Sequence, residues 1–414
     1  VNITDADFNA QNNNVTIAAS DLENIGNATT GTVTLDNAVK ITGSQSQVTA
    51  ALVTTDSLVV AGHTGTIANV STAVNAAQGK AIAAATNIDA VFAGGVEDST
   101  TNLYNTTNSE LTTNFSAITT EDADVEVTIS DADFNAENNN NTVAATTLSG
   151  IGNATTGTVT VTNAVKITGS QEEVTDALVT TAKMVEVGAA IVTITDADFN
   201  AQNNNVTIDA SDLKNIGNAT TGTVTVTNAV KITGSQEDVT AALVTTDSLV
   251  EVSDAAVTIT DADFNSTNNN VTIDASDLKN IGNATTGTVT VTNAVKITGT
   301  AADVTAALVT TDSKVEVSDA LVNVTGASIE QYDDIANETT GDVTYTLSDT
   351  AANITSAAAS KINNATTLTV TSGGGANDLN LENATTANLT AITATGDTNI
   401  DNVKLSAAVT SSNI

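Results

Sequence analysis

The sequence predicts a β-rich repeat solenoid, an elongated rod of stacked rungs in which strand pairs alternate with short helices or loops. Three observations lead to this prediction: motifs recur at a fixed period, short segments alternate Val or Ile with Thr, and Pro and Trp are absent. Internal repetition over tens of residues is typical of stacked repeat proteins. Alternation of apolar and polar residues is typical of half-buried strands, and a stacked strand tolerates Pro poorly because Pro lacks a backbone donor.

Three motifs set the period. DADFN begins at Asp5, Asp131, Asp196 and Asp261; GNATTGTVT begins at Gly26, Gly152, Gly217 and Gly282; NAVKITG begins at Asn37, Asn163, Asn228 and Asn293. The last three copies of each lie 65 residues apart, and the first lies 126 residues before the second. We therefore expect solenoid repeats over 1–62, 125–190, 191–255 and 256–321, a diverged repeat over 63–124, and diverged C-terminal repeats over 322–414.

The 65 residues from Val206 to Asn270 show the elements of one repeat unit in their order. The alternation in NVTIDAS predicts a strand. SDLKNIGNATTG is expected to contain a helix, with Ser211 or Asp212 as its N-cap. Gly217 or Gly222 is expected to end that helix. TVTVTNAVKITG then reads as two alternating strands around a central Asn-Ala, with Val and Ile on one face and Thr and Lys on the other.

The second half of the unit repeats this scheme. In SQEDVTAALVTT, Ser235 followed three residues later by Asp238 resembles a capping box with Asp in place of Glu. Val239, Ala242 and Leu243 then fall on one helical face. LVEVSDAAVTIT is another strand pair. Three such coils per unit average about 22 residues each. A string of small β-sandwich domains is the alternative fold, against which the recurring helical segments argue.

Composition excludes several classes of function. The chain has 48 acidic residues and 11 basic ones, all lysines, for a formal net charge of −37. Nucleic-acid binding requires a basic surface and is therefore not expected. The absence of Cys excludes zinc fingers, iron–sulfur clusters and thiolate nucleophiles, and His63 is the single histidine. We expect no enzyme and, because no long apolar run occurs, no membrane span.

The acidic DADFN motif supplies the candidate metal ligands. Carboxylate and amide oxygens are the ligands that Ca²⁺ prefers. The candidates are Asp5, Asp7, Asn9, Asp131, Asp133, Asn135, Asp196, Asp198, Asn200, Asp261, Asp263 and Asn265. The motif lacks the Gly and Glu of an EF-hand loop. The alternative is structural: the first Asp caps a short helical turn, and Phe fills a corner of the rung.

Two other patterns recur with the repeats. Lys40, Lys166, Lys231 and Lys296 are expected to point outward from their strands, to oppose sheet aggregation and to pair with carboxylates. Asn-Ala-Thr and Asn-Val-Thr triplets would be glycosylation sites in a suitable secretory host, although many such triplets arise by chance in a chain so rich in Asn and Thr.

Two segments carry a resemblance to known proteins, VKITGSQEDVTAALVTTDSLVEVSD and YTLSDTAANITSAAASKINNATTLTVTS. Both resemble repeats of long bacterial surface proteins, which include cyanobacterial and proteobacterial adhesins, surface-layer proteins and RTX-type secreted giants. The resemblance extends over most of the chain but concerns composition, which is rich in Thr, Ala, Asn and Asp and free of Cys and Pro, rather than a specific motif. The RTX nonapeptide is absent, so the calcium roll of that family is not implied. It implies an extracellular or cell-surface location.

These observations together predict a structural extracellular protein. We expect a subunit of a cell-surface filament, sheath or surface layer that assembles end to end into a homopolymer. The chain begins at Val1 in the middle of a predicted rung, which indicates a processed product or a fragment. A rung interrupted there would leave a strand edge open for pairing with another copy.

Other functions remain open. One is a calcium-dependent adhesin stalk or binding module for cell-surface glycans, with Phe92, Tyr104 and Phe115 of the diverged repeat as ligand contacts. Ice binding by Thr-x-Thr rows is weaker, because those rows are prominent on only about one rung in three. A polysaccharide-cleaving β-helix is not expected, because clustered carboxylates with an aromatic or basic substrate platform are missing.

Overall fold

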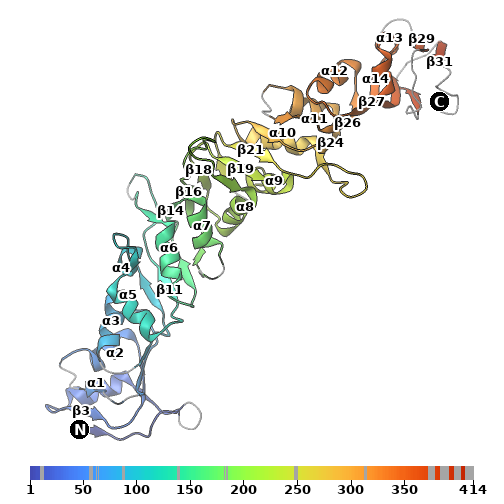
Figure 1. Cartoon of the computed structure of the whole chain (residues 1–414). Coiled ribbons are helices and arrows are strands. Elements are labelled where there is room, and N and C mark those ends of the chain that lie inside the picture. The colour runs from blue at the N-terminus through green and yellow to red at the C-terminus, as the bar shows by residue number, and fades with distance from the viewer. Residues whose placement is uncertain are drawn as a thin grey trace. The chain divides into compact units, whose positions relative to one another are not determined.

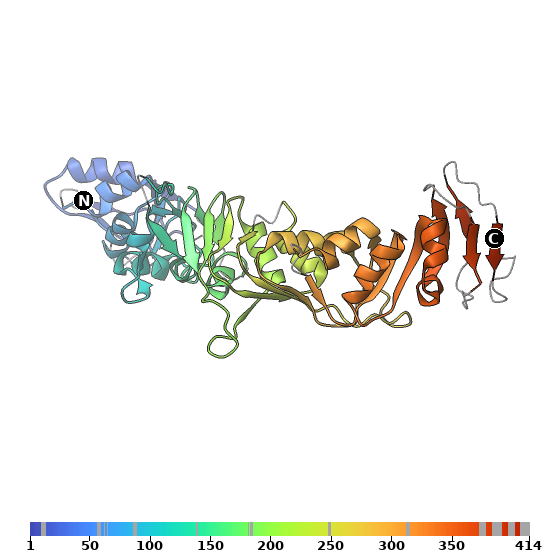
Figure 2. The same cartoon turned by 90° about the horizontal axis from the view of Figure 1, so that it is seen from above.

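The computed structural model shows repeated α/β units in which strands alternate with helices and pair in parallel (Figures 1 and 2). The predicted β-rich solenoid rod is therefore wrong. The structure describes residues 1–9, 14–55, 59–61, 63, 65–85, 89–137, 140–180, 182, 185–246, 250–311, 315–371, 378–382, 391–395 and 402–405.

The chain divides into two compact units. The first unit contains Val1–Asp196 and Asn215–Thr225, and the second contains Ala197–Lys214 and Val226–Ile414. This division differs from the six repeats expected from the motif spacing, whose boundaries stay a prediction. Residues at the C-terminal end that were expected to be strand-like, beyond Leu405, lie outside the described residues.

Short parallel strands form the sheets of the first unit. Most neighbours in these sheets are not consecutive strands of the sequence, so a helix or another strand intervenes between them. The sheets are β1 (Asn2–Ile3), β3 (Val33–Leu35) and β5 (Val59–Val60); β2 (Thr16–Ala18), β4 (Lys40–Gly43), β6 (Ile67–Val70) and β7 (Asp89–Val91); β8 (Val96–Asp98), β11 (Val127–Ile129), β13 (Val159–Val161) and β15 (Val185–Val187); and β12 (Thr142–Ala144), β14 (Lys166–Gly169) and β16 (Ile191–Ile194), which β18 (Val224–Val226) follows. A hairpin of β9 (Tyr104–Asn105) and β10 (Glu110–Leu111) is antiparallel.

The second unit repeats this arrangement. Its sheets are β17 (Thr207–Asp209), β19 (Lys231–Gly234), β21 (Ala256–Ile259), β23 (Val289–Val291) and β25 (Val315–Val317); β22 (Thr272–Asp274), β24 (Lys296–Thr300), β26 (Leu321–Ala327), β27 (Val343–Thr350), β28 (Ala365–Thr371) and β30 (Ile392–Ala394); and β29 (Asp378–Leu381) with β31 (Asn402–Leu405). The strand β20 (Val250–Val252) lies between α9 and β21 in the chain.

Helices connect the strands. They are α1 (Ala19–Asn27), α2 (Gln45–Leu52), α3 (Ala76–Ala84), α4 (Thr100–Leu103), α5 (Thr113–Glu121), α6 (Ala145–Gly152), α7 (Gln171–Leu178), α8 (Ala210–Ala219), α9 (Gln236–Leu243), α10 (Ala275–Ala284), α11 (Ala301–Val304) with a π-helical turn η2 (Thr305–Val309), α12 (Ile329–Asn337), α13 (Ala351–Ser356) and α14 (Ala359–Asn363). No helix in the described part of the chain has both the length and the apolarity needed to cross a bilayer.

The predicted faces of the strands are confirmed. Val224, Val226 and Ile232 are buried, whereas Thr225 between the two valines is only half-buried. In the second unit, Ile232 of β19 is in register with Ile208 of β17 and Val257 of β21, so one apolar residue lies beside the next along the ladder. Such rows form the sheet side of the core.

The helices form the other side of the core, and this explains why the predicted fold class failed. Leu213 and Ile216 of α8 and Val239 and Ala242 of α9 are fully buried. A parallel strand pair needs a crossover connection, and the helices supply it. The sequence predicted both helices, but as short additions to a β-structure. In the structure they form one of the two walls of the core, and the sheet forms the other.

The helix caps were predicted in part. Ser235 caps α9 as expected, because its Oγ accepts the N–H of Asp238 at 3.1 Å. The helix α8, however, begins at Ala210, and the carboxylate of Asp209 accepts the N–H of Ser211 at 2.8 Å. Ser211 and Asp212 are therefore inside the helix, and the predicted cap was placed two or three residues too late.

Candidate functional site

The first aspartate of each DADFN loop (5–9, 131–135, 196–200 and 261–265) was a candidate metal ligand. In the second unit, Oδ2 of Asp261 accepts the N–H of Gln236, the first residue of α9, at 2.6 Å. The equivalent bonds join Asp196 to Gln171 of α7 at 2.6 Å and Asp131 to Thr100 of α4 at 2.7 Å. A carboxylate there satisfies an amide that has no partner within the helix and complements the helix dipole.

The second aspartate of the loop binds the following NAV turn. Oδ1 of Asp198 accepts the N–H of Ala229 at 2.9 Å, and the N–H of Phe199 donates to the carbonyl of Ala229 at 2.8 Å. The same carboxylate–amide bond joins Asp7 to Ala38, Asp133 to Ala164 and Asp263 to Ala294 at 2.7–2.9 Å. This carboxylate therefore connects the DADFN loop to the NAV turn further along the chain.

The asparagine of the motif stabilises the loop locally. Oδ1 of Asn200 accepts the N–H of Gln202 at 3.0 Å, and Asn265 binds Thr267 in the same way at 2.9 Å. An Asn side chain that bonds to the backbone two residues on forms an Asx turn. The third candidate ligand of these loops is therefore engaged in a turn.

The phenylalanine of each loop lies under the lysine of the VKIT strand that follows the NAV turn. The Nζ of Lys231 is 5.4 Å from the ring centroid of Phe199. The other pairs are Lys40–Phe8, Lys166–Phe134 and Lys296–Phe264, at 5.0–5.8 Å. A cation above an aromatic face is attracted by the ring quadrupole. The lysines were expected to pair with carboxylates, and no local pattern indicates this aromatic partner 32 residues away.

The acidic loops do not form a ready cation site. Among the residues that the structure describes, no group of three His, Cys, Asp or Glu side chains is placed to hold a metal ion. Within the 131–135, 196–200 and 261–265 loops the two aspartates bind two different backbone amides, so both carboxylates already have hydrogen-bond donors. The alternative role predicted for the first Asp was to cap a short helical turn of its own loop. In the 131–135, 196–200 and 261–265 loops it caps instead a helix that lies earlier in the chain. Calcium at these loops stays a prediction.

That prediction requires calcium to do more than screen charge. At a net charge of −37 any salt relieves repulsion between carboxylates. If the loops bind Ca²⁺, millimolar CaCl₂ will raise the melting temperature above that in NaCl of matched ionic strength, and EDTA will reverse the rise. Asp198→Asn would then reduce the difference. Identical melting curves in the two matched salts would remove the specific site.

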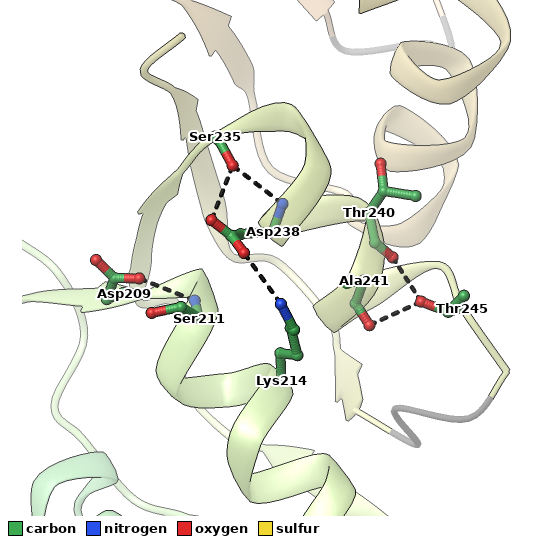
Figure 3. A network of polar contacts seen from close by, with 8 residues as sticks. All are labelled: Asp209, Ser211, Lys214, Ser235, Asp238, Thr240, Ala241 and Thr245. Atoms are coloured by element: carbon green, nitrogen blue, oxygen red, sulfur yellow. Dashed lines mark hydrogen bonds and ion pairs between the residues drawn. The ribbon is translucent and has the colours of Figure 1, made fainter.

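A second polar cluster links two helices of the second unit (Figure 3). Nζ of Lys214 in α8 lies 3.2 Å from Oδ1 of Asp238, whose Oδ2 accepts the hydroxyl of Ser235 at 2.8 Å. The Ser235 hydroxyl, and after it Lys214, hold the pKa of Asp238 below its usual range. Because both charged side chains are more than a third exposed, the ion pair contributes little to stability.

This cluster explains why Asp replaces the usual Glu or Gln of a capping box. In α2 and α7, the side chains of Gln47 and Glu173 reach back to the backbone N–H of the N-cap residue. The shorter Asp238 bonds instead to the hydroxyl of Ser235 and faces Lys214. The next repeat keeps the pair as Lys279–Asp303 at 3.8 Å.

The aromatic residues of the diverged repeat are mostly internal. Phe92 and Phe115 are buried, at 2% and 0% exposure, so the expectation that they contact a ligand is wrong. Tyr104 is half-buried and borders a hollow of about 440 Å³ together with Glu110 and Thr112. His63 is exposed in a bend.

The diverged repeat also contains a buried acid that sequence reasoning missed. Asp122 is 8% exposed at the end of α5, and its Oδ2 accepts the N–H of Phe92 at 2.6 Å. Burial raises the pKa of Asp122 above 3.8, the hydrogen bond from Phe92 opposes this rise, and the neighbouring Asp124 adds to it. Removing the ionised form from water therefore outweighs the backbone hydrogen bonds from Phe92 and Asp124, which lower the pKa.

Replacing Asp122 with Asn should stabilise the fold at neutral pH. The amide keeps an acceptor for Phe92 but carries no charge. A raised folded-state pKa means that ionisation of Asp122 opposes folding, and this opposition disappears as the pH falls through the raised pKa to below 3.8. Urea unfolding across this range should show the advantage of the variant shrinking on acidification. A difference independent of pH would contradict the assignment.

A hollow recurs beside the DADFN loops. In the first unit, a hollow of about 660 Å³ is bordered by Asp131, Asn140 and Thr142. In the second, an equivalent hollow of about 270 Å³ is bordered by Asp261, Asn269 and Val271. Both hollows lie between the loop and the first strand that follows it.

Comparisons with known proteins supply no relative. No protein-family model matches the chain, and a search of curated proteins finds no significant match. The candidate site must therefore be interpreted from its own geometry.

Proposed function

We propose that the chain is a structural protein of a cell surface, a subunit of a filament, sheath or surface layer that self-associates into a homopolymer. One observation carries the proposal: the recurring aspartates of the DADFN loops bind backbone amides of strand–helix segments before and after them in the chain. Asp261 holds the N-terminus of α9, and Asp263 holds the turn at Ala294. A repeated motif that connects one strand–helix segment to another suits a protein with a structural role.

The charge supports the same function. The composition of 48 acidic and 11 basic residues favours solubility and repels acidic partners. The resemblance of two segments to bacterial surface repeats motivates the extracellular location. The end-to-end mode of assembly follows the general rule that an open strand edge templates pairing with another chain.

Assembly of the full chain tests this function. We expect filaments or sheets in negative-stain electron micrographs and a rise in mass with protein concentration in analytical ultracentrifugation. The series should be run with and without calcium, and with bovine serum albumin as a control for nonspecific aggregation. A monodisperse species at all concentrations, with calcium present, would contradict the proposal.

A calcium-dependent adhesin is the second candidate, favoured by the half-buried Tyr104 beside its hollow. Aromatic faces in hollows suit sugar rings, because the apolar side of a sugar packs on the ring. Calcium-dependent binding to a glycan array by a chain that stays monomeric would favour this candidate over the scaffold.

A further inference from the structure

We propose that Asn14, Asn140, Asn205 and Asn270 are attachment sites for N-linked glycans, and that the asparagines of the Asn-Ala-Thr triplets at Asn153, Asn218 and Asn283 are not. The four triplets that begin at these residues, 14–16, 140–142, 205–207 and 270–272, are called the strand sequons here. Each runs into the first residue of a strand, namely β2, β12, β17 or β22. The inference goes beyond the proposed function but presumes the export that a surface location entails.

Three Asn-Ala-Thr triplets, which begin at Asn153, Asn218 and Asn283, have a buried threonine whose hydroxyl is bonded within the fold. The Oγ1 of Thr220 donates to the carbonyl of Ala190 at 2.6 Å, and Thr220 is 5% exposed. Thr155 and Thr285 bind the carbonyls of Val125 and Ala255 in the same way, at 2.7 and 2.6 Å. A transferase that reads Asn-x-Thr must reach both the amide and the hydroxyl. In these triplets the hydroxyl is covered by the preceding layer.

The strand sequons present the opposite arrangement. Asn205 and Thr207 are exposed, and so are Asn270 and Thr272. Within the described residues, the structure gives the Asn205 and Asn270 side chains no hydrogen bond. Amide and hydroxyl are therefore both accessible in the folded chain.

The asparagine that precedes each of these sequons, Asn204 or Asn269, stabilises the turn. Nδ2 of Asn204 donates to the carbonyls of Ala197 and Asp198 at 3.1 and 3.0 Å, and its Oδ1 accepts the N–H of Val206 at 3.3 Å. Asn269 makes the same three bonds in the next repeat. The hydrogen bonds of the turn therefore involve the side chain of Asn204, and they do not account for the recurrence of Asn205.

The spacing of the strand sequons is constant. In all four copies the Asn follows the first Asp of the DADFN loop by nine residues, and the Thr follows it by eleven. The middle residue is not constant, because Asn141 stands where the other copies have Val. The two positions that a transferase reads are thus kept, while the position that it ignores changes.

The surroundings also suit a sugar. The described residues include six exposed large apolar side chains, and Val15, Val206 and Val271, which are middle residues of strand sequons, are three of them. Exposures of 44%, 60% and 63% leave these side chains largely in water, and the apolar face of a sugar ring would cover them. The hollows beside Thr142 and Val271 provide space for the first sugar.

The reaction requires a lipid-diphosphate-linked oligosaccharide as its second substrate. The amide nitrogen of the Asn forms a bond to C1 of the first sugar, and the bond from C1 to the phosphate oxygen breaks. The lipid diphosphate leaves with the electron pair, and a base of the transferase takes the amide proton. No oxidant or reductant is involved.

The test uses the purified full chain, a membrane oligosaccharyltransferase that accepts folded proteins, and its lipid-linked oligosaccharide. Glycopeptide mass spectrometry measures occupancy at each Asn. In the folded chain, we expect occupancy at Asn205 and Asn270 to exceed that at Asn218 and Asn283 by about tenfold or more, since the latter require local opening of the structure. In the urea-unfolded, diluted chain this ratio should fall toward one.

Thr207→Val provides the matched control, because it keeps a β-branched residue in β17 while removing the hydroxyl. It should abolish modification of Asn205 and leave Asn270 as an internal reference. Equal occupancy of both triplet classes in the folded chain, or no modification of the strand sequons in either form, would overturn the inference. Because the assay does not measure assembly, its failure is distinct from failure of the proposed scaffold.

Discussion

Ile232→Asp is expected to unfold the second unit or to lower its free energy of unfolding by about 3–5 kcal/mol. Ile232 is fully buried in β19, in register with Ile208 and Val257 of the flanking strands. A carboxylate at this point would lie in an apolar row without a cation or an amide donor. Burying such an uncompensated charge is among the most destabilising single changes.

The measurement is urea unfolding followed by circular dichroism, with Thr233→Ser as the matched control. Thr233 is the next residue of β19 and faces the opposite side, where it is half-buried. Its replacement should shift the midpoint only slightly. Equal midpoints for Ile232→Asp and the parent chain would mean that the faces of β19 are assigned backwards.

The faces of the strands were predictable because they follow from local alternation. Val224, Thr225 and Val226 alternate in sequence, and their burial alternates in the structure. The fold class was not predictable in this way, because alternation shows which face is buried but not what covers it. The cover is supplied by helices such as α8, through Leu213 and Ile216.

The DADFN loops show a second limit of sequence reasoning. Carboxylates bind calcium and backbone amides through the same oxygens, so the motif alone does not distinguish the two roles. The partners that decide lie far along the chain: Asp261 binds an amide 25 residues away, and Asp198 binds one 31 residues away. Only the Asx turn at Asn200 is local, and only such turns can be read from neighbouring residues.

The glycine of the Thr-Thr-Gly segment is a position at which one added methyl group should have a large effect. An ideal Cβ on Gly222 would lie 2.2 Å from the carbonyl oxygen of Ala190, far inside van der Waals contact. That oxygen is also held by the hydroxyl of Thr220 at 2.6 Å. Backbone must therefore move, and Gly222→Ala should lower the free energy of unfolding by about 2–4 kcal/mol.

Gly188→Ala is the control that isolates this crowding within the first unit. A Cβ on Gly188 would meet nothing within 4 Å, so this variant should match the parent chain or gain slightly through a less flexible unfolded state. Thermal unfolding of both variants beside the parent gives the comparison. The same close approach to a carbonyl recurs at Gly157, Gly287 and Gly341. A Gly222→Ala chain as stable as the parent would therefore contradict the packing of all four segments, since the carbonyl of Ala190 could not then lie where the structure places it.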